Sequence, residues 1–208
     1  INGFWSVQLK IKLLIFFLIF GCFLKCETKM EYKIPKSKEI LWGKNGLIRK
    51  LNLAPKNRKE ELKLRQKMLK THQSMGLMTL GMMSYQYYLG KKLLDSNQEY
   101  KMRHKYLGYT TFCSYIFTAS LSIFAPPAFR YSDGISSIKL HKYLSYIHFI
   151  GMLTMPYLGY LSSGALDYKN NSGTIEYNYS EKASNIHHYV GNITFYSFSL
   201  AFLTTLLP

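Results

Sequence analysis

The chain is poor in cysteine and in acidic side chains, and several motifs of known chemistry are missing from it. Three cysteines, two of them near the N-terminus, give no disulfide framework, and Cys113 is expected to be a small apolar residue. No glycine-rich phosphate loop, CxxCH haem-attachment motif, HExxH zinc motif or GxSxG elbow is present. The 11 Asp and Glu residues form no pair within the apolar windows described next, so a hydrolase is not expected.

Charged side chains are absent from four long windows, at residues 71–90, 106–129, 143–166 and 183–208. A helix of about 20 residues, at about 1.5 Å per residue, can cross the hydrocarbon core of a bilayer. Tyrosines cluster at the window edges, as in an interfacial aromatic belt. We therefore expect an all-α membrane protein, an up-and-down bundle of four transmembrane helices. The many Tyr, Ser, Thr and Gly residues of the windows leave a soluble helical core as the alternative.

A short apolar segment precedes these windows. Residues 1–26 contain Lys10 and Lys12, followed by 12 mostly apolar residues at positions 13–24. This run is too short to span a bilayer comfortably and suits the central region of a signal peptide. An uncleaved membrane anchor is the alternative, and the residues around Cys22 loosely resemble a lipoprotein cleavage site.

Residues 27–65 form a basic segment between this leader and the expected transmembrane domain at 66–208. Fourteen Lys and Arg residues lie between positions 29 and 70, and they supply most of the net charge of +16. Beside a membrane domain, such a segment is expected to touch anionic lipid rather than nucleic acid. From Arg58 the sequence favours a helix that continues into the first window.

A histidine opens each window, and a small residue follows it four positions later. Aligned on their histidines, the four segments are HQSMG, HKYLG, HKYLS and HHYVG. Residues i and i+4 share one face of a helix, so each imidazole has almost no side chain beside it one turn deeper. A ligating imidazole must hold a flat macrocycle against its own helix, where a large side chain would collide with the ring. The four pairs are His72 with Gly76, His104 with Gly108, His141 with Ser145, and His187 with Gly191.

The order of the helices decides which histidines can meet. In an up-and-down bundle, the first and third helices begin on one side and the second and fourth on the other. We therefore expect His72 to pair with His141, and His104 to pair with His187. Each pair would hold one haem between two imidazoles.

Two further histidines leave the choice of ligand open. His148 lies seven residues after His141 on nearly the same face, and His188 competes with His187, although only His187 keeps the spacing to Gly191. Each histidine could instead be a polar anchor at a membrane interface. Metals other than haem iron have little support, because Asp and Glu are absent from the windows.

This layout resembles the cytochrome b561 family over residues 66–208, and HHYVGNITFY is similar to the histidine-glycine helix start of that family. The resemblance implies two non-covalent b-type haems that carry electrons across a bacterial inner membrane. The donor and acceptor would be a quinol or a redox protein. Arg103 and Lys142 adjoin the expected ligands and would pair with haem propionates.

The resemblance does not decide whether the chain is an oxidoreductase or an electron-transfer subunit, or whether it forms a homo-oligomer. The alternative function is that of a haem-free four-helix membrane protein in assembly or interaction. Its basic segment would then bind lipid or a partner protein, and no nucleic acid is expected as a partner.

Overall fold

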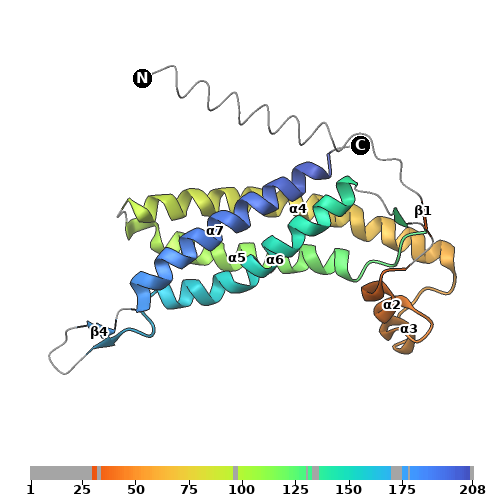
Figure 1. The fold of residues 1–208 in the computed structure, drawn as a ribbon, viewed down its shortest axis with the longest axis horizontal. Helices are drawn as coiled ribbons and strands as arrows, with labels where there is room; N and C mark the ends of the chain where they lie inside the picture. Colours follow the sequence, from red (N-terminus) through yellow and green to blue (C-terminus); the bar gives the residue numbers. More distant parts are fainter. Residues whose placement is uncertain are drawn as a thin grey trace, which may run out of the picture.

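The computed structural model of the protein describes residues 30–31, 34–95, 98–129, 131–132, 136–169, 175–177 and 179–206. Four long helices form a bundle, and short helices cover one of its ends (Figure 1). The long helices are α4 (Arg58–Leu94), α5 (Lys101–Ile123), α6 (Ser137–Ser162) and α7 (Tyr179–Thr204). The shorter elements are β1 (Met30–Glu31), α2 (Lys36–Trp42), α3 (Leu47–Lys50), the 3₁₀ helix η1 (Gln98–Tyr100), β2 (Tyr131–Ser132), β3 (Tyr168–Lys169) and β4 (Ile175–Tyr177).

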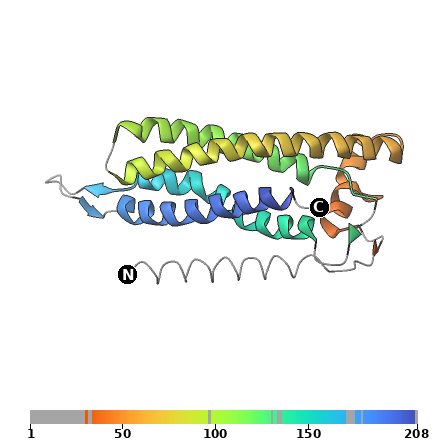
Figure 2. The same cartoon turned by 90° about the horizontal axis from the view of Figure 1, so that it is seen from above.

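Successive long helices run in opposite directions and close into a ring of four. Helix α4 packs against α5 and α7, and α6 also packs against α5 and α7. Strand β1 pairs antiparallel with β2, and β3 with β4. The β3–β4 hairpin joins α6 to α7 at the end opposite α2 and α3 (Figures 1 and 2). Helices α4 and α6 therefore begin at the end covered by α2 and α3, here called the cap end, and α5 and α7 begin at the hairpin end.

Side-chain caps start two of the long helices. Asn57 Oδ1 accepts a hydrogen bond from the backbone N–H of Glu60 at 3.0 Å, which begins α4. Ser136 Oγ accepts from the backbone N–H of Lys139 at 3.3 Å, which begins α6. Both residues have the extended backbone that an N-cap requires. Because His72 and His141 follow Asn57 and Ser136 at fixed distances along the chain, these caps set the position of both histidines in their helices.

The four long helices share one register when they are counted from their histidines. Residues 4, 7 and 11 positions after each histidine lie on the same face of its helix as the histidine, and this face points into the bundle. They are called the first, second and third positions here. Small residues occupy the first position in all four helices. The buried polar residues at the second position are Thr79, Thr111, His148 and Thr194. The buried apolar residues at the third position, which form the centre of the core, are Met83, Tyr115, Met152 and Phe198.

The α4–α5 and α6–α7 hairpins repeat one sequence pattern. The segments HKYLGYTTFCS at 104–114 and HHYVGNITFYS at 187–197 share the pattern HxYxGxxTFxS, and YLG occurs at both 88–90 and 157–159. His72 precedes Gly90 by 18 residues, and His141 precedes Gly159 by the same interval. The bundle is thus built from two similar halves, each a helical hairpin.

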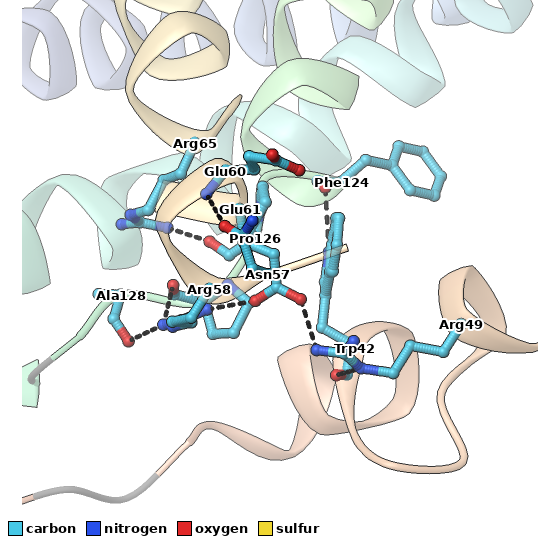
Figure 3. Close-up of polar contacts among 11 residues, drawn as sticks. Trp42, Arg49, Asn57, Arg58, Glu60, Glu61, Arg65, Phe124, Pro126 and Ala128 are labelled. Carbon is cyan, nitrogen blue, oxygen red and sulfur yellow. Dashed lines mark hydrogen bonds and ion pairs between the residues drawn. The ribbon is translucent and has the colours of Figure 1, made fainter. Parts of the chain in front are cut away.

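A network of charged side chains holds the cap end together (Figure 3). The Glu61 carboxylate, whose side chain is only 3% exposed, accepts hydrogen bonds from Arg49 and from Arg58, the latter at 2.7 Å. Helix α5 ends nearby, and the last carbonyls of a helix have no partner within it. Side chains of the basic segment satisfy these carbonyls and those of the following loop. The donors are Lys38 to Ser122, Ile123 and Ala125; Trp42 to Phe124; Arg58 to Pro127 and Ala128; and Arg65 to Pro126.

The expectation of four transmembrane helices is wrong. None of the helices in the described part of the chain is both long and apolar enough to cross a membrane. The four windows coincide with parts of α4, α5, α6 and α7, but they are rich in Tyr, Ser, Thr and Gly, which lower their apolarity although they carry no charge. The location in a bacterial inner membrane rested on those spans and is wrong for the same reason. The signal peptide or anchor predicted within residues 1–26 lies outside the described residues.

Replacing Gly151 by Ala should destabilise the protein. A β-carbon at position 151 would overlap Thr194 Oγ1 on the facing helix. We expect the free energy of unfolding to fall by about 1–3 kcal/mol, measured by chemical denaturation with circular dichroism. Gly81→Ala is the matched control, because nothing lies within 4 Å of the added atom. It should raise stability by about 0.5–1 kcal/mol, since Ala favours a helix over Gly. Equal effects of the two changes would contradict close packing of α6 against α7.

Glu61→Gln should weaken the cap end. The change removes the charge that Arg49 and Arg58 share, and the expected loss of unfolding free energy is about 1–3 kcal/mol. The control is Glu60→Gln, which makes the same change of charge on an exposed neighbour and should alter stability by no more than about 0.5 kcal/mol. Thermal unfolding of both variants in parallel tests this difference.

Candidate paired histidine sites

The first histidine pair lies toward the cap end, between α4 and α6. The ring centroids of His72 and His141 are 6.2 Å apart, and the ring planes are nearly perpendicular, at 85°. His72 Nδ1 lies 2.8 Å from the carbonyl oxygen of Thr118, and His141 Nδ1 lies 2.8 Å from that of Ala201. A carbonyl oxygen only accepts, so each Nδ1 carries the hydrogen and each Nε2 keeps its lone pair. This is the arrangement of metal-ligating histidines, whose second nitrogen donates to a carbonyl or carboxylate.

The second pair lies toward the hairpin end, between α5 and α7. The ring centroids of His104 and His187 are 6.1 Å apart, at an interplanar angle of 63°. An added β-carbon at Gly90 would lie 3.3 Å from His104 Cε1, and one at Gly159 would lie 3.6 Å from His187 Cε1. The two glycines, which end the repeated YLG segments, therefore make room for the two imidazoles.

Hydrogen bonding differs between the two pairs. The Nδ1 atoms of His104 and His187 are buried and have no hydrogen-bond partner among the described residues. Buried polar atoms without a partner are uncommon in folded proteins, and each calls for an explanation. The pair at the hairpin end thus has free hydrogen-bonding and ligating capacity in a protein interior.

Each pair joins the two halves of the bundle. The α4–α5 hairpin supplies His72 to one pair and His104 to the other, and the α6–α7 hairpin supplies His141 and His187 in the same order. On α4 and α6, 18 residues separate the histidine of one pair from the glycine beside the other pair. On α5 and α7, 14 residues separate the histidine of one pair from the carbonyl that contacts the other pair. At 1.5 Å per residue the two pairs are therefore about 21–27 Å apart along the bundle.

The small residues one turn after the histidines have different surroundings. Gly76 is buried, yet a β-carbon there would meet no atom within 4 Å, so the space beside it is open. At Gly108 the Gln86 Nε2 atom would lie 3.1 Å from the added carbon, and at Gly191 the Met155 Cε atom would lie 3.3 Å away. The room expected beside the ligands is therefore present at Gly76. Flexible side chains of the neighbouring helices fill it at the other two glycines.

The fourth small residue, Ser145, is half-buried. Its hydroxyl donates a 2.7 Å hydrogen bond to the carbonyl oxygen of Lys142, one turn earlier on α6. The hydroxyl is thereby satisfied within its own helix.

His148 and His188 do not pair with another histidine among the described residues. His148 Nδ1 and the Tyr115 hydroxyl share a 2.7 Å hydrogen bond, and the His148 ring lies 5.0 Å from that of Phe198. It takes the position that Thr79, Thr111 and Thr194 hold in the other helices, deeper than the His72–His141 pair. His188 Nε2 lies 3.3 Å from the side-chain nitrogen of Asn192 on its own helix. Of the six histidines, the four that are followed by a small residue four positions later, His72, His104, His141 and His187, are the ones brought together in pairs.

Burial lowers the pKa of three of the four paired imidazoles, which favours their neutral form near pH 7. It lowers the pKa of His72 and of His104 from the usual 6.5, and it lowers the pKa of His187 to about 4, where the neighbouring His104 adds a smaller effect. A neutral imidazole has the lone pair that a metal requires.

The donor set excludes a metal ion held by protein side chains alone. Within the described part of the chain, no group of three or more His, Cys, Asp or Glu side chains could hold a metal ion, so the prediction of a metal-binding group is wrong for the protein side chains taken alone. Imidazole–metal bonds of about 2.0–2.1 Å imply that two imidazoles on opposite faces of one metal have centroids about 6 Å apart. The spacing in both pairs matches this value. Such a metal would need its remaining ligands from a cofactor, as iron has in haem.

Arg103 and Lys142, the expected partners of haem propionates, contact residues of their own helices or of the turn before them. The Arg103 guanidinium lies 4.0 Å from the Glu99 carboxylate and over the ring of Tyr100, while Lys142 lies over the ring of Tyr146. Both cations are exposed.

Comparison with family models, with curated proteins and with solved structures found no match to this chain.

His148→Thr should reduce the sensitivity of the fold to acid. Burial lowers the pKa of His148 from 6.5 to about 4, so between these values the unfolded chain binds a proton that the folded protein excludes. Stability is therefore lost as the pH falls from 6.5 toward 4, by at most about 3 kcal/mol for this group. Threonine, which occupies the equivalent position in the other helices, removes this contribution. The measurement is the free energy of unfolding against pH.

The control is Tyr115→Phe, which removes the hydrogen bond to His148 but leaves the buried imidazole. This variant should lose about 1 kcal/mol over the whole pH range and keep most of the acid sensitivity. A His148→Thr variant with the pH profile of the wild type would show that other groups dominate.

Proposed function

We propose that the chain is an electron-transfer protein that binds two b-type haems, each held by one histidine pair without covalent attachment. The observation that carries the proposal is the spacing of the pairs: two sets of half-buried imidazoles, 6.1 and 6.2 Å apart, face one another from opposite halves of the bundle. The similarity of HHYVGNITFY to the helix start of the cytochrome b561 family supports it. Passage across a membrane is no part of the proposal, because no described helix could span one.

Haem held by the two histidine pairs would supply one-electron chemistry, and the ligating imidazoles would set its potential. The chain orients those ligands. The carbonyls of Thr118 and Ala201 fix the rings of His72 and His141 and direct each Nε2 away from its hydrogen-bonded side. These hydrogen bonds also raise the basicity of the imidazoles.

At the hairpin end the glycines have the corresponding task. Gly90 and Gly159 lie against the rings of His104 and His187; an added β-carbon would press on His104 at 3.3 Å and would touch His187 at 3.6 Å. The unpartnered Nδ1 atoms of these rings fit a site that is completed by a further group.

The centre of the bundle separates the two pairs. Met83, Tyr115, Met152 and Phe198 fill it with apolar side chains, which keep water out of the interior between the sites. A donor at one end and an acceptor at the other would each meet one site. A quinol and a redox protein both have the one-electron chemistry that such a site needs.

Haem titration tests the proposal. The purified chain should bind two equivalents of haem, with low-spin absorbance that dithionite changes from the ferric to the ferrous form. His104→Ala and His72→Ala should each remove one equivalent, because each destroys one pair. The double variant should bind none. Absorbance and extracted haem per chain are the measurements.

The matched controls are His188→Ala and His148→Thr, which change histidines outside the pairs and should leave two equivalents bound. A wild-type chain that binds no haem would overturn the proposal and favour a haem-free interaction protein. Two equivalents bound to His104→Ala would overturn the assignment of the pairs.

A further inference from the structure

The first three turns of α4 carry two kinds of cation on opposite sides. At 3.6 residues per turn, four lysines fall within an arc of about 80° on one side of the helix. Arg58, Glu61 and Arg65 fall on the opposite side, together with His72. The four residues, here called the lysine stripe, are Lys59, Lys63, Lys67 and Lys70.

The two sides differ in what the charges do. Arg58 and Arg65 donate hydrogen bonds to Glu61 or to the loop after α5, so their charges are used inside the cap end (Figure 3). All four members of the lysine stripe are exposed, and within the described residues no hydrogen bond or ion pair ties them to the protein. Within α4, Glu60 is the one acidic residue that borders the stripe. The stripe is therefore a patch of free positive charge.

The stripe lies beside the first histidine pair. Lys70 precedes His72 by two residues, and the ring of His72 points to the interior, where its Nδ1 meets Thr118 of α5. The stripe and the ring are thus on opposite sides of one helix, whose diameter with side chains is about 10–12 Å. A molecule bound to the stripe would approach the His72–His141 pair closely.

We propose that the lysine stripe is the docking surface for an acidic electron-transfer protein, which exchanges electrons at the His72–His141 end. This inference rests on the proposed function. Lysine is a compact, strongly hydrated charge, and exposed charges of this kind raise association rates more than they slow dissociation. Fast, weak and salt-sensitive binding suits a partner that must leave after each transfer.

The surroundings of the stripe favour a protein over a membrane or a nucleic acid. Helices that lie on lipid combine basic residues with an exposed apolar face, but the exposed positions from 59 to 71 are Lys, Glu, Gln and Thr only. Nucleic acids are commonly held by arginine forks and stacked aromatic rings. Here no aromatic residue occurs between 58 and 71, and both arginines of this stretch, Arg58 and Arg65, are engaged at the cap end.

The test measures binding of a net-negative [2Fe–2S] ferredoxin to the full chain by calorimetry, at low and at physiological ionic strength. The four-lysine variant, with every member of the stripe changed to Gln, should bind about tenfold or more weakly at low salt and should lose most of the salt dependence. The control variant makes the same change of charge at the hairpin end and should bind within about twofold of wild type. Its four substitutions, each to Gln, are at Lys91, Lys101, Lys105 and Lys182.

Equal weakening in both variants would show that only net charge matters and would overturn the proposal. So would an unchanged affinity in the four-lysine variant. Vesicles of phosphatidylserine and phosphatidylcholine, and duplex DNA, serve as competing probes. A loss of binding to either of them, with ferredoxin binding intact, would assign the stripe to that probe instead.

Binding is measured on haem-free chain as well as after haem addition, which separates the two proposals. If the chain binds no haem but the stripe still determines ferredoxin affinity, the proposed function fails and the docking surface stands. If two haems bind but the four-lysine variant binds ferredoxin as tightly as the wild type, the docking surface fails and the proposed function stands. In the haem-loaded protein, stopped-flow reduction by ferredoxin should slow about tenfold in the four-lysine variant and not in the control.

Discussion

The enclosure of four half-buried imidazoles in register constrains the whole bundle. A buried imidazole must satisfy two nitrogens, and the helices around each ring are placed accordingly. At the cap end the carbonyl oxygens of Thr118 and Ala201 accept a hydrogen bond from one nitrogen of each ring. At the hairpin end two glycines bring the helices close enough to enclose the rings and leave one nitrogen of each without a partner. Departures of this kind from complete hydrogen bonding are expected where a protein functions.

Repetition of one hairpin explains why there are two such sites and why they are alike. Each half contributes the same register of histidine, small residue, buried polar residue and core residue, and packing two halves together creates a pair at each end. The equivalence is not complete, since His148 stands where the other helices have threonine, and it shares a hydrogen bond with the Tyr115 hydroxyl. The midpoint of the bundle is therefore where the two halves differ most in chemistry.

Much of this arrangement follows from sequence patterns, and some of it does not. The charge-free windows place the four helices, and alternation then brings His72 near His141 and His104 near His187. The membrane assignment failed because absence of charge is not the same as apolarity, and tyrosine, serine and threonine separate the two. Thr118 and Ala201 could not be identified, because a backbone carbonyl has no signature in the sequence. Gly90 and Gly159 could have been, since both end the repeated YLG segments. The cap was also missed, because nothing in a run of lysines and arginines tells which of them turn inward to a buried Glu61.

The carbonyl contacts of His72 and His141 have a consequence for the order in which the two ends fill. Both rings lose their rotational freedom when the chain folds, so the cap end is preorganised and little further ordering is needed when a ligand arrives. The Nδ1 atoms of His104 and His187 have no hydrogen-bond partner among the described residues, so these rings are fixed less firmly, and their ordering costs entropy when the ligand binds. A ligand should therefore bind first at the His72–His141 pair, at the cap end, and second at the His104–His187 pair, at the hairpin end.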